Sequence, residues 1–593
     1  MVKWSGLVVR VKAIAYLAPA FWAFAFLMPV WSNPLAAQDF VSPEAATGRY
    51  LQPGGTAKSF MVVAANPLAA EAGAEILKAG GSAIDAAITV QLVLNIVEPQ
   101  SSGIGGGTFI VHWDHADQKI ATYDGREVAP SAADSRRFIA ADGSAMGRTD
   151  AVIGGRSVGV PGVLRALELA HREHGKLPWA DLFAPAIALA ENGFPLSPRL
   201  HDLLDFDRSL NEIEPAASFF YQPDGSPKPV GTIIKNPMFA ATLREIASGG
   251  AGVFHSGRIA QDIVAAVTGA RVKPGDMTLA DLAAYRAVER PPICASYRDR
   301  KVCGMGPPTS GGIGVLQTLK LLEQFDLAAL GPASAKAYHA LIEAGRLVFA
   351  DRAVYIADPD VLPVPTAALL SPEYLERRGH MIDLNARMKN APPGKLPVTT
   401  GSNWRTAESP ERPSTSHFSI VDAEGNAVAM TTSIEASFGS HLMVRGFMLN
   451  NTLTDFSYSD IAKGNVVANA VGPNKRPRSS MAPTLVFDRD GKLEIVVGSP
   501  GGPAIVGFVV DTLVAMIDWN MTPQDAISAP HVIGFGRGVM IEPDLASIKD
   551  ELEALGHQAR IGEFPSGIHA IRITKDKLLG GADPRREGAV AGE

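Results

Sequence analysis

Residues 414–439 read STSHFSIVDAEGNAVAMTTSIEASFG and predict a β-hairpin at the centre of the fold. Apolar residues recur at 418–421 and 427–430, on either side of the turn-forming sequence Ala-Glu-Gly-Asn. If Asp422 pairs with Ala427, Thr415 lies opposite Ile434, and a shift of one residue places it opposite Ser433 instead. In both registers, hydroxyl groups and a carboxylate gather at the open end of the hairpin.

The stretch before the hairpin, residues 400–414, is polar, contains two prolines and lacks helical or strand periodicity. A structureless stretch of this length is uncommon inside a compact domain and is usually functional or disordered. Because it runs directly into a strand that begins with Thr415, it suits a chain that cuts itself between Ser414 and Thr415. The cut would free an α-amine that can act as base for the threonine hydroxyl. A surface loop entering an ordinary hairpin is the alternative interpretation.

Further motifs occur in order along the chain. They are AANPLAAEAG from Ala64, GGSAIDAA from Gly80, VEPQSSGIGGG from Val97, DGRE from Asp124, GPPTSGG from Gly306, NKRPRSSMAPT from Asn474 and GSPGG from Gly498. Together with the hairpin, these motifs resemble the γ-glutamyltranspeptidases, which are N-terminal-nucleophile hydrolases. The resemblance covers nearly all of the chain after its first residues.

This resemblance implies a mixed α/β (α+β) fold, a four-layer αββα sandwich in which the chain processes itself into two subunits. The large subunit would span residues 38–414 and the small subunit residues 415–593, and the two would form a heterodimer. Periodicity alone predicts only a mixture of helices and strands. The predicted helices are 67–79, 82–98, 163–174, 179–192, 335–355, 523–528 and 545–555, and the predicted strands after the hairpin are 442–450, 484–487 and 493–498.

The resemblance implies a γ-glutamyltransferase or glutathione hydrolase that needs no cofactor. Thr415 would take the γ-glutamyl group of glutathione or a similar amide as an ester, and water, an amino acid or a short peptide would release it. Ser433 would orient the Thr415 hydroxyl. The backbone N–H groups of Gly501 and Gly502 would stabilise the oxyanion, because a glycine pair allows close approach.

A γ-glutamyl substrate carries an α-carboxylate and an α-ammonium group. Arg126 can grip a carboxylate through two parallel hydrogen bonds, which a lysine does less well. By resemblance, Ser479 and Ser480 lie beside that carboxylate, and Glu435 and Asp455 receive the ammonium group. Taken singly, these residues also fit an ordinary ion pair, a turn and a loop cap.

Three departures from the family pattern affect this interpretation. Ser433 stands where threonine is common and lacks the methyl group that helps to fix the rotamer. Thr452 replaces a Gln or Glu that often lines the glutamyl pocket. Residues 455–474 are few compared with relatives that carry a lid loop, so we expect an open site. The alternatives are therefore a cephalosporin (glutaryl) acylase, or an uncleaved binding relative without activity.

The first residues, 1–37, have the pattern of a signal peptide. Basic residues precede an apolar run at 13–30, and small residues follow it. Export to a periplasm or secretion is the expected consequence. A membrane anchor is the alternative, which Pro19 and Pro29 disfavour.

The net charge of −7 disfavours nucleic-acid binding, because phosphate affinity needs a basic face. Two cysteines, Cys294 and Cys303, would face each other across a two-residue turn at 298–299, so either a disulfide or two buried thiols is expected. His171 and His174 lie on one predicted helix without an evident third ligand, so we expect no metal site. The glycine-rich GIGGG follows a helix rather than a strand, which argues against a dinucleotide loop.

Overall fold

The predicted hairpin lies inside one of two seven-stranded sheets in the computed structural model, which describes residues 46–50, 53–396, 404–406, 414–458, 466–535 and 538–593. The hairpin sheet has the order β21 (Ala589–Gly592), β2 (Met61–Ala64), β10 (Ser414–Val421), β11 (Ala427–Glu435), β3 (Gly107–Asp114), β4 (Lys119–Gly125), β7 (Val288–Arg290). The second sheet has the order β1 (Gly55–Ala57), β20 (Leu578–Ala582), β19 (His569–Ile573), β15 (Leu493–Gly498), β14 (Thr484–Phe487), β9 (Arg300–Gly304), β8 (Ile293–Tyr297).

The register of the hairpin differs by one residue from the count that starts at Asp422. Val421 pairs with Ala427, so Thr415 faces Ser433 and not Ile434. The reason is that the Asp422 carboxylate closes the turn by accepting hydrogen bonds from backbone N–H groups at 424 and 426. An aspartate committed to its own turn is no longer part of the ladder.

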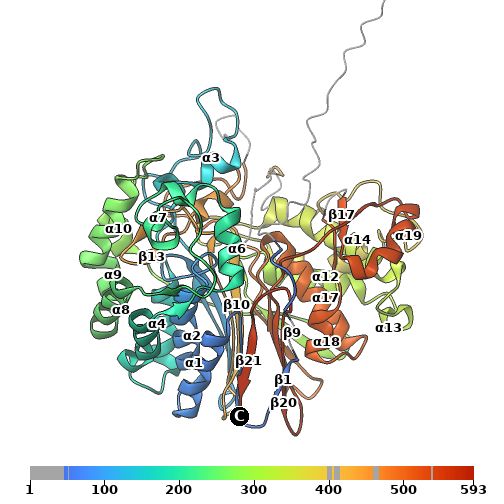
Figure 1. The fold of residues 1–593 in the computed structure, drawn as a ribbon. Helices are drawn as coiled ribbons and strands as arrows, with labels where there is room; N and C mark the ends of the chain where they lie inside the picture. Colours follow the sequence, from blue (N-terminus) through green and yellow to red (C-terminus); the bar gives the residue numbers. More distant parts are fainter. Residues whose placement is uncertain (1–45, 51–52, 397–403, 407–413, 459–465, 536–537) are drawn as a thin grey trace, which may run out of the picture. The chain divides into compact units, whose positions relative to one another are not determined.

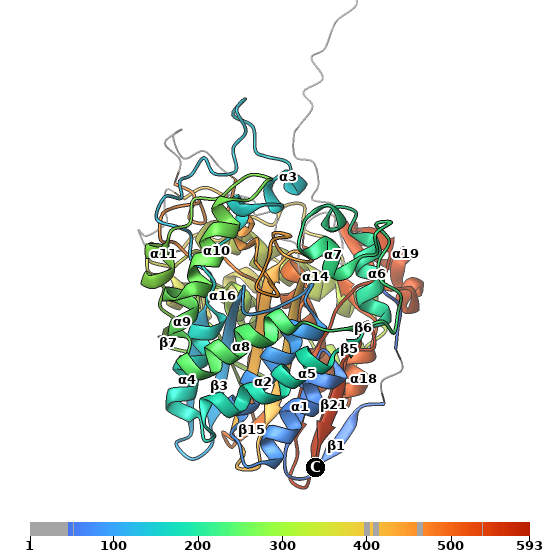
Figure 2. The same cartoon turned by 60° about the vertical axis from the view of Figure 1, so that its left-hand side comes forward.

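The two sheets stack face to face and a helical layer covers each outer face, which confirms the predicted αββα arrangement. In Figure 1, the strands run through the middle, with α1, α2 and α4 to the left and α12, α17 and α18 to the right. The helices on the hairpin-sheet side include α1 (Pro67–Lys78), α2 (Ala83–Val97), α4 (Val163–His174), α5 (Ala184–Asn192), α8 (Pro237–Gly249), α9 (Gly252–Ser256) and α10 (Arg258–Thr268). Figure 2 shows α1, α2, α4, α5 and α8 spread over that side.

The helices on the side of the second sheet come from both halves of the chain. They are α12 (Gly311–Leu322), α14 (Ala335–Tyr355), α16 (Pro372–Gly379), α17 (Ile505–Ile517), α18 (Pro523–Ser528) and α19 (Lys549–Ala554). The hairpin sheet also mixes strands from before and after residue 414, because β10 is bonded to both β2 and β11. The two halves are therefore interleaved within one sheet.

Most predicted elements appear where the sequence places them. Ser82 and Asp85 form the capping box that begins α2. The predicted helix 179–192 is instead a 3-10 turn followed by α5, because Pro185 has no N–H for the preceding turn. The predicted helix 545–555 likewise divides into a 3-10 segment (Pro543–Ile548) and α19.

The predicted strand 442–450 is a small hairpin of β12 (Met443–Val444) and β13 (Phe447–Met448). Arg445 and Gly446 turn the chain there with φ of 47° and 87°, a conformation that interrupts a strand.

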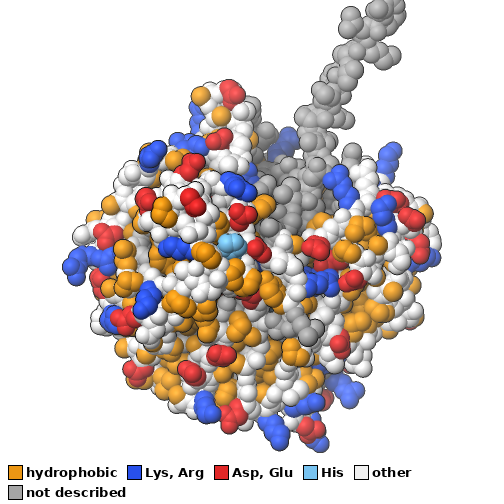
Figure 3. Space-filling view, in the orientation of Figure 1, with side chains coloured by type: hydrophobic (Ala, Val, Ile, Leu, Met, Phe, Trp, Pro, Cys, Tyr) orange, Lys and Arg blue, Asp and Glu red, His pale blue; other side chains and the backbone are white. Residues whose placement is uncertain are grey.

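None of the described helices is both long and apolar enough to cross a membrane. The predicted signal peptide, residues 1–37, lies outside the described residues, as do residues 459–465 of the short stretch before Asn474. On the face drawn in Figure 3, acidic and basic side chains are interspersed with hydrophobic ones, and neither sign forms a continuous patch among the described residues.

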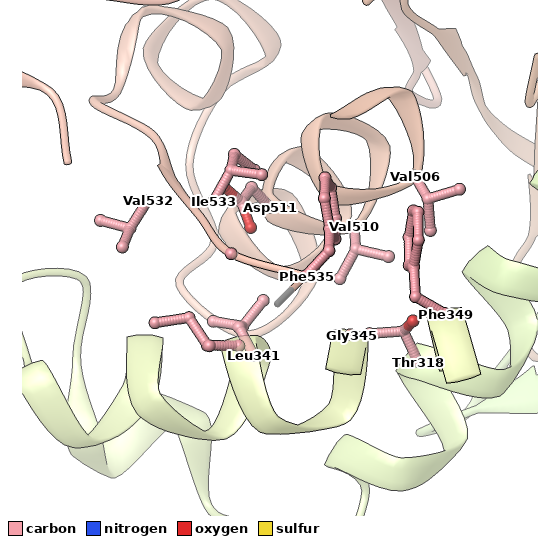
Figure 4. A pocket seen from close by; sticks show the side chains of 13 residues that line it. Thr318, Leu341, Gly345, Phe349, Val506, Val510, Asp511, Val532, Ile533 and Phe535 are labelled. Atoms are coloured by element: carbon pink, nitrogen blue, oxygen red, sulfur yellow. The ribbon is translucent and has the colours of Figure 1, made fainter. Parts of the chain in front are cut away.

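Figure 4 shows an apolar recess between α14 and α17. Leu341 and Phe349 line it from α14, and Val506 and Val510 line it from α17, with Asp511 beside them. The predicted site residues are not among those that line this recess, so the site lies elsewhere in the described part of the chain.

Candidate active site

Thr415 and its neighbours form a buried hydroxyl cluster at the open end of the hairpin. The Thr415 Oγ1 hydroxyl donates to Ser433 Oγ at 3.1 Å, and the Ser433 hydroxyl donates to the carbonyl oxygen of Ser414 at 2.7 Å. All three side chains are buried. Ser433 therefore touches both the predicted nucleophile and the carbonyl of the bond that the nucleophile would attack.

A bulge in the hairpin produces this arrangement. The register shifts between Ser414 and Thr415, so that Ser414 pairs with Glu435 and Ile434 is left out of the ladder. The N–H of Ile434 donates instead to the carbonyl oxygen of Ser101 at 3.1 Å. Glu435 adopts a φ of 80°, and its N–H donates to Ser433 Oγ at 2.9 Å. Backbone strain of this kind at a non-glycine residue is typical of functional sites.

Two further contacts fix the ends of the Ser414–Thr415 peptide. The Ser414 hydroxyl donates to the backbone oxygen of Gln100 at 2.6 Å. Arg586 donates from Nη1 to the carbonyl oxygen of Thr415 at 2.9 Å, and its Nε donates to the Ser566 carbonyl at 2.9 Å. The strand that begins with Thr415 is thus held from both sides.

Gly501 and Gly502 stand at the end of β15, where the chain turns into α17. Both have positive φ, 133° and 51°, and a Cβ atom at Gly501 would lie 2.6 Å from the ring of Phe508. Their N–H groups belong to the start of a helical turn, where donors have no partner within the helix. The pair therefore offers backbone donors that only glycines can present here.

The glycine pair lies near the nucleophile strand because the sheets approach closely there. A Cβ atom on Gly498, at the end of β15, would lie 2.2 Å from the His417 ring of β10. A Cβ atom on Gly567 would touch Pro500 at 2.7 Å and Arg586 at 2.6 Å. Since Arg586 binds the Thr415 carbonyl, the segment around Pro500 and Gly501 lies at the Thr415 end of the hairpin.

Arg126 and Asp455 come together as the sequence suggests, but they bind each other. Arg126 Nη2 donates to Asp455 Oδ2 at 2.5 Å, and both side chains are buried. The same guanidinium donates to the backbone oxygens of Pro477 at 3.2 Å and Arg478 at 2.9 Å. Arg126 is therefore a fixed cation beside the chain segment that carries the paired serines.

Ser479 and Ser480 are packed against the loop before α12. The Ser479 carbonyl accepts hydrogen bonds from the N–H and the hydroxyl of Ser310 at 2.8 and 2.7 Å. Ser480 Oγ accepts from Arg352 Nη2 at 3.0 Å. The two serines directly follow Arg478, whose carbonyl oxygen accepts a hydrogen bond from Arg126. Arg126 and the serines therefore lie on connected parts of the structure, as the predicted binding of one carboxylate requires.

Glu435 is engaged by two side chains that the sequence did not single out. Its Oε1 accepts from Arg148 Nη2 at 2.8 Å, and its Oε2 accepts from Asn451 Nδ2. The role of Glu435 in receiving an ammonium group therefore stays a prediction. Both of its oxygens already have donors.

Thr452, which stands where relatives often carry a Gln or Glu, binds Glu127 in the structure. Its side chain is fully buried, and its hydroxyl donates to Glu127 Oε1 at 2.6 Å. Burial raises the pKa of the Glu127 carboxyl, while Arg126 and the Thr452 hydroxyl oppose the increase. Thr452 thus supports the carboxylate that follows Arg126 in sequence.

The structure joins Cys294 and Cys303 by a disulfide between β8 and β9, with Cα atoms 4.1 Å apart. His171 and His174 make hydrogen bonds to the Leu177 carbonyl at 2.9 Å and to the Tyr123 hydroxyl at 2.8 Å. Among the described residues, no group of three or more His, Cys, Asp or Glu converges as metal ligands would.

Three residues that contact the site were not predicted from the sequence: Arg148, Asn451 and Arg586. Asn451 directly precedes Thr452 and lies four residues before Asp455, both of which were named from the sequence, so its position offered a signal. Arg148 and Arg586 are far from Glu435 and Thr415 in sequence, and each meets its partner only through the fold. An arginine outside a motif gives no local signal of such a contact.

The chain is similar to known proteins over most of its length. A family model described as gamma-glutamyltranspeptidase matches residues 69–593. The chain is 36% identical over 549 residues to the glutathione hydrolase proenzyme of Bacillus subtilis (strain 168), covering 90% of this chain and 92% of the relative. It is 32% identical over 535 residues to the Acylase ACY 1 proenzyme of Pseudomonas sp. (strain SE83), covering 88% of this chain and 91% of the relative. The solved cephalosporin acylase from Bacillus halodurans superposes with a TM-score of 0.81 at 28% identity, covering 94% of this chain and 99% of that structure.

Proposed function

Because the chain belongs to the gamma-glutamyltranspeptidase family and is an enzyme of the glutathione hydrolase type, we propose that it cleaves itself before Thr415 and then transfers γ-glutamyl groups. The donor is glutathione or another γ-glutamyl amide. The acceptor is water, an amino acid or a short peptide.

One observation carries this proposal: Ser433 contacts both the Thr415 hydroxyl and the Ser414 carbonyl oxygen. In the first stage, Thr415 Oγ attacks the carbonyl carbon of Ser414, and the Ser433 hydroxyl stabilises the charge that develops on its oxygen. The bond from that carbon to the Thr415 nitrogen breaks, the nitrogen takes the proton, and an ester links Ser414 to Thr415 Oγ. Water hydrolyses the ester and leaves a Ser414 carboxylate and a free Thr415 amine.

In the second stage, the free amine acts as the base for the Thr415 hydroxyl. The hydroxyl attacks the γ-carbonyl carbon of the donor, and the N–H groups of Gly501 and Gly502 stabilise the oxyanion. The leaving amine departs with a proton and a γ-glutamyl ester remains on Thr415. Attack by water or by an acceptor amine on that ester releases the product and restores the hydroxyl.

Substrate binding is assigned to the groups around the Arg126–Asp455 pair. Arg126, with Ser479 and Ser480, binds the α-carboxylate of the γ-glutamyl group. Asp455 and Glu435 face the α-ammonium group of the γ-glutamyl group. The ion pair with Arg148 partly neutralises the negative charge of Glu435. The ion pair of Arg126 with Asp455 supports this, because a zwitterionic substrate end can bind both members of a fixed pair.

The two products of cleavage, residues 38–414 and 415–593, stay together as large and small subunits. The interleaved hairpin sheet supports this, because β10 remains hydrogen-bonded to β2 and β11 to β3 after the cut. We also propose that residues 1–37 direct the protein to the periplasm or to secretion.

Intact mass and amino-terminal sequencing of the purified protein test the first stage. We expect a fragment that begins at Thr415 and is absent from a Thr415→Ala variant. Ser416→Ala is the matched control, because it removes a neighbouring hydroxyl that contacts Ser102 and not Thr415. A single uncut chain in the wild type would instead favour the interpretation that this protein is an uncleaved binding relative without activity.

A glutaryl acylase is the second candidate. The similarity to a cephalosporin acylase and the engaged Glu435 carboxylate favour it. Hydrolysis of a γ-glutamyl anilide and of a glutaryl anilide, which lacks the α-amine, discriminates between the two. We expect the γ-glutamyl compound to be turned over faster, and the opposite order would establish the acylase.

A further inference from the structure

Arg148 reaches the candidate site from a segment outside the family motifs. It begins α3 (Arg148–Val152), which lies at the top of Figure 1. The segment is held there by apolar packing, because Phe138 and Ala151 belong to one buried cluster with Leu453 and Phe456. Leu453 and Phe456 lie on either side of Asp455 in sequence, so this segment packs directly against the residues around Asp455.

The two terminal nitrogens of the Arg148 guanidinium differ in their hydrogen bonding. Its Nη2 donates to Glu435 Oε1 at 2.8 Å, and the two side chains are only 15% and 2% exposed. Its Nη1 is buried and has no hydrogen-bond partner among the described residues. A buried guanidinium donor without a partner is costly, so a binding site that supplies an oxygen acceptor accounts for it.

Tyr458 interacts with members of both ion pairs, Arg148–Glu435 and Arg126–Asp455. Its buried hydroxyl interacts electrostatically with Arg148, Glu435 and Asp455. Burial raises the pKa of that hydroxyl, and the two carboxylates act in the same direction while Arg148 opposes them. Tyr458 is therefore within electrostatic range of both ion pairs.

We propose that Arg148 is a specificity-determining residue that lets the pocket accept acyl donors with or without an α-amine. It occupies the Glu435 carboxylate with one nitrogen and presents the other to an oxygen of the acyl group. This inference rests on the function proposed above and concerns the same pocket.

The physical reason is the balance of charge at the ammonium position. With Arg148 present, both carboxylates near Tyr458 are paired, Glu435 with Arg148 and Asp455 with Arg126. An α-ammonium group gains less from a paired carboxylate than from a free one, whereas a glutaryl group has no ammonium to satisfy. Arg148 thus reduces the difference in kcat/KM between γ-glutamyl and glutaryl donors.

The test compares kcat/KM for γ-glutamyl and glutaryl p-nitroanilide in matured enzyme. Arg148→Met removes the cation that pairs with the Glu435 carboxylate and leaves the Asn451 amide as a donor to it. We expect the ratio of γ-glutamyl to glutaryl kcat/KM to rise roughly tenfold, the worth of one charge-assisted hydrogen bond. Glu435→Gln leaves Arg148 as an unpaired cation, so the ratio falls by a similar factor. Arg148→Lys keeps the charge and restores a ratio near that of the wild type.

Arg136→Met is the matched control, because Arg136 is an exposed arginine on the same segment. An unchanged ratio in Arg148→Met, with both donors still hydrolysed, overturns the inference. If Arg148→Met fails to mature, the Glu435→Gln variant alone tests the inference. Its ratio of γ-glutamyl to glutaryl kcat/KM must then fall below that of the wild type, and an unchanged ratio overturns the inference. A matured wild type that hydrolyses neither donor refutes the proposed function itself and the inference with it.

Discussion

Replacing Ser433 with alanine removes one hydroxyl that makes three hydrogen bonds at the proposed cleavage site. It accepts from Thr415 Oγ1 at 3.1 Å and from the Glu435 N–H at 2.9 Å, and it donates to the Ser414 carbonyl oxygen at 2.7 Å. Only the last bond strengthens as negative charge develops on that oxygen. The variant therefore loses transition-state stabilisation as well as ground-state contacts.

The size of the effect follows from comparable donors. Removing one hydrogen bond to a developing oxyanion lowers a rate by about 10²–10³, or about 3–4 kcal/mol. The buried N–H of Glu435 also loses its acceptor, which costs about 1–3 kcal/mol of folding free energy. A cost of that size leaves a domain folded when its stability is on the order of 10 kcal/mol. We expect a folded precursor of Ser433→Ala that matures several hundred times more slowly.

The assay is a time course of intact mass on freshly purified precursor, which follows the appearance of the fragment that begins at Thr415. Ser433→Thr keeps the hydroxyl and should mature within a few-fold of the wild-type rate. Ser416→Ala, which removes the neighbouring hydroxyl on the same strand, should mature normally. Maturation of Ser433→Ala at the wild-type rate would refute the role of the Ser433 hydroxyl.

Three further predictions concern binding and stability. Arg126→Lys should raise KM for a γ-glutamyl anilide roughly tenfold to a hundredfold, because lysine cannot bind a carboxylate through two parallel bonds, and an unchanged KM would contradict this. Replacing Cys294 and Cys303 with serine should lower the free energy of unfolding by about 2–3 kcal/mol, since the disulfide closes a short loop. Chemical reduction of the wild type should lower Tm as much as the double serine substitution does. Burial alone raises the pKa of the Asp583 carboxyl, but Arg585 at 3.1 Å helps to bring it down to about 2, below the unfolded value of about 3.9. Its stabilisation of about 3 kcal/mol is therefore present above about pH 4 and lost as pH falls toward 2. The Tm difference between wild type and Asp583→Asn should be constant from pH 5 to 8 and shrink at pH 3.

The helices and strands could be predicted wherever local signals were strong. The segment 335–355 forms α14 with the predicted ends, and β14 and β15 also match their predicted ranges. One residue overrode the periodicity where Pro185 divided a predicted helix. The hairpin register was left open between two alternatives, and the Asp422 cap accounts for the one that sets Thr415 opposite Ser433.

The site was predicted as a set of residues but not as a set of contacts. Thr415, Ser433, Arg126 and Asp455 were all named from motifs, and the structure brings them together in two contacting pairs. The motifs did not indicate that Arg126 and Asp455 bind each other, or that Glu435 is engaged by Arg148. Motifs identify chemical types, whereas pairing depends on distances that the chain reaches only when folded.

The sequence by itself determined the hairpin, its threonine at the start of β10 and the order of the motifs, because these depend on residues that are close in the chain. Only the tertiary structure decided what surrounds that threonine. Arg586 lies 171 positions from the Thr415 carbonyl that it binds, and Arg148 lies 287 positions from Glu435. Contacts over such separations are set by the stacking of two sheets and the packing of α3, and no local pattern encodes them.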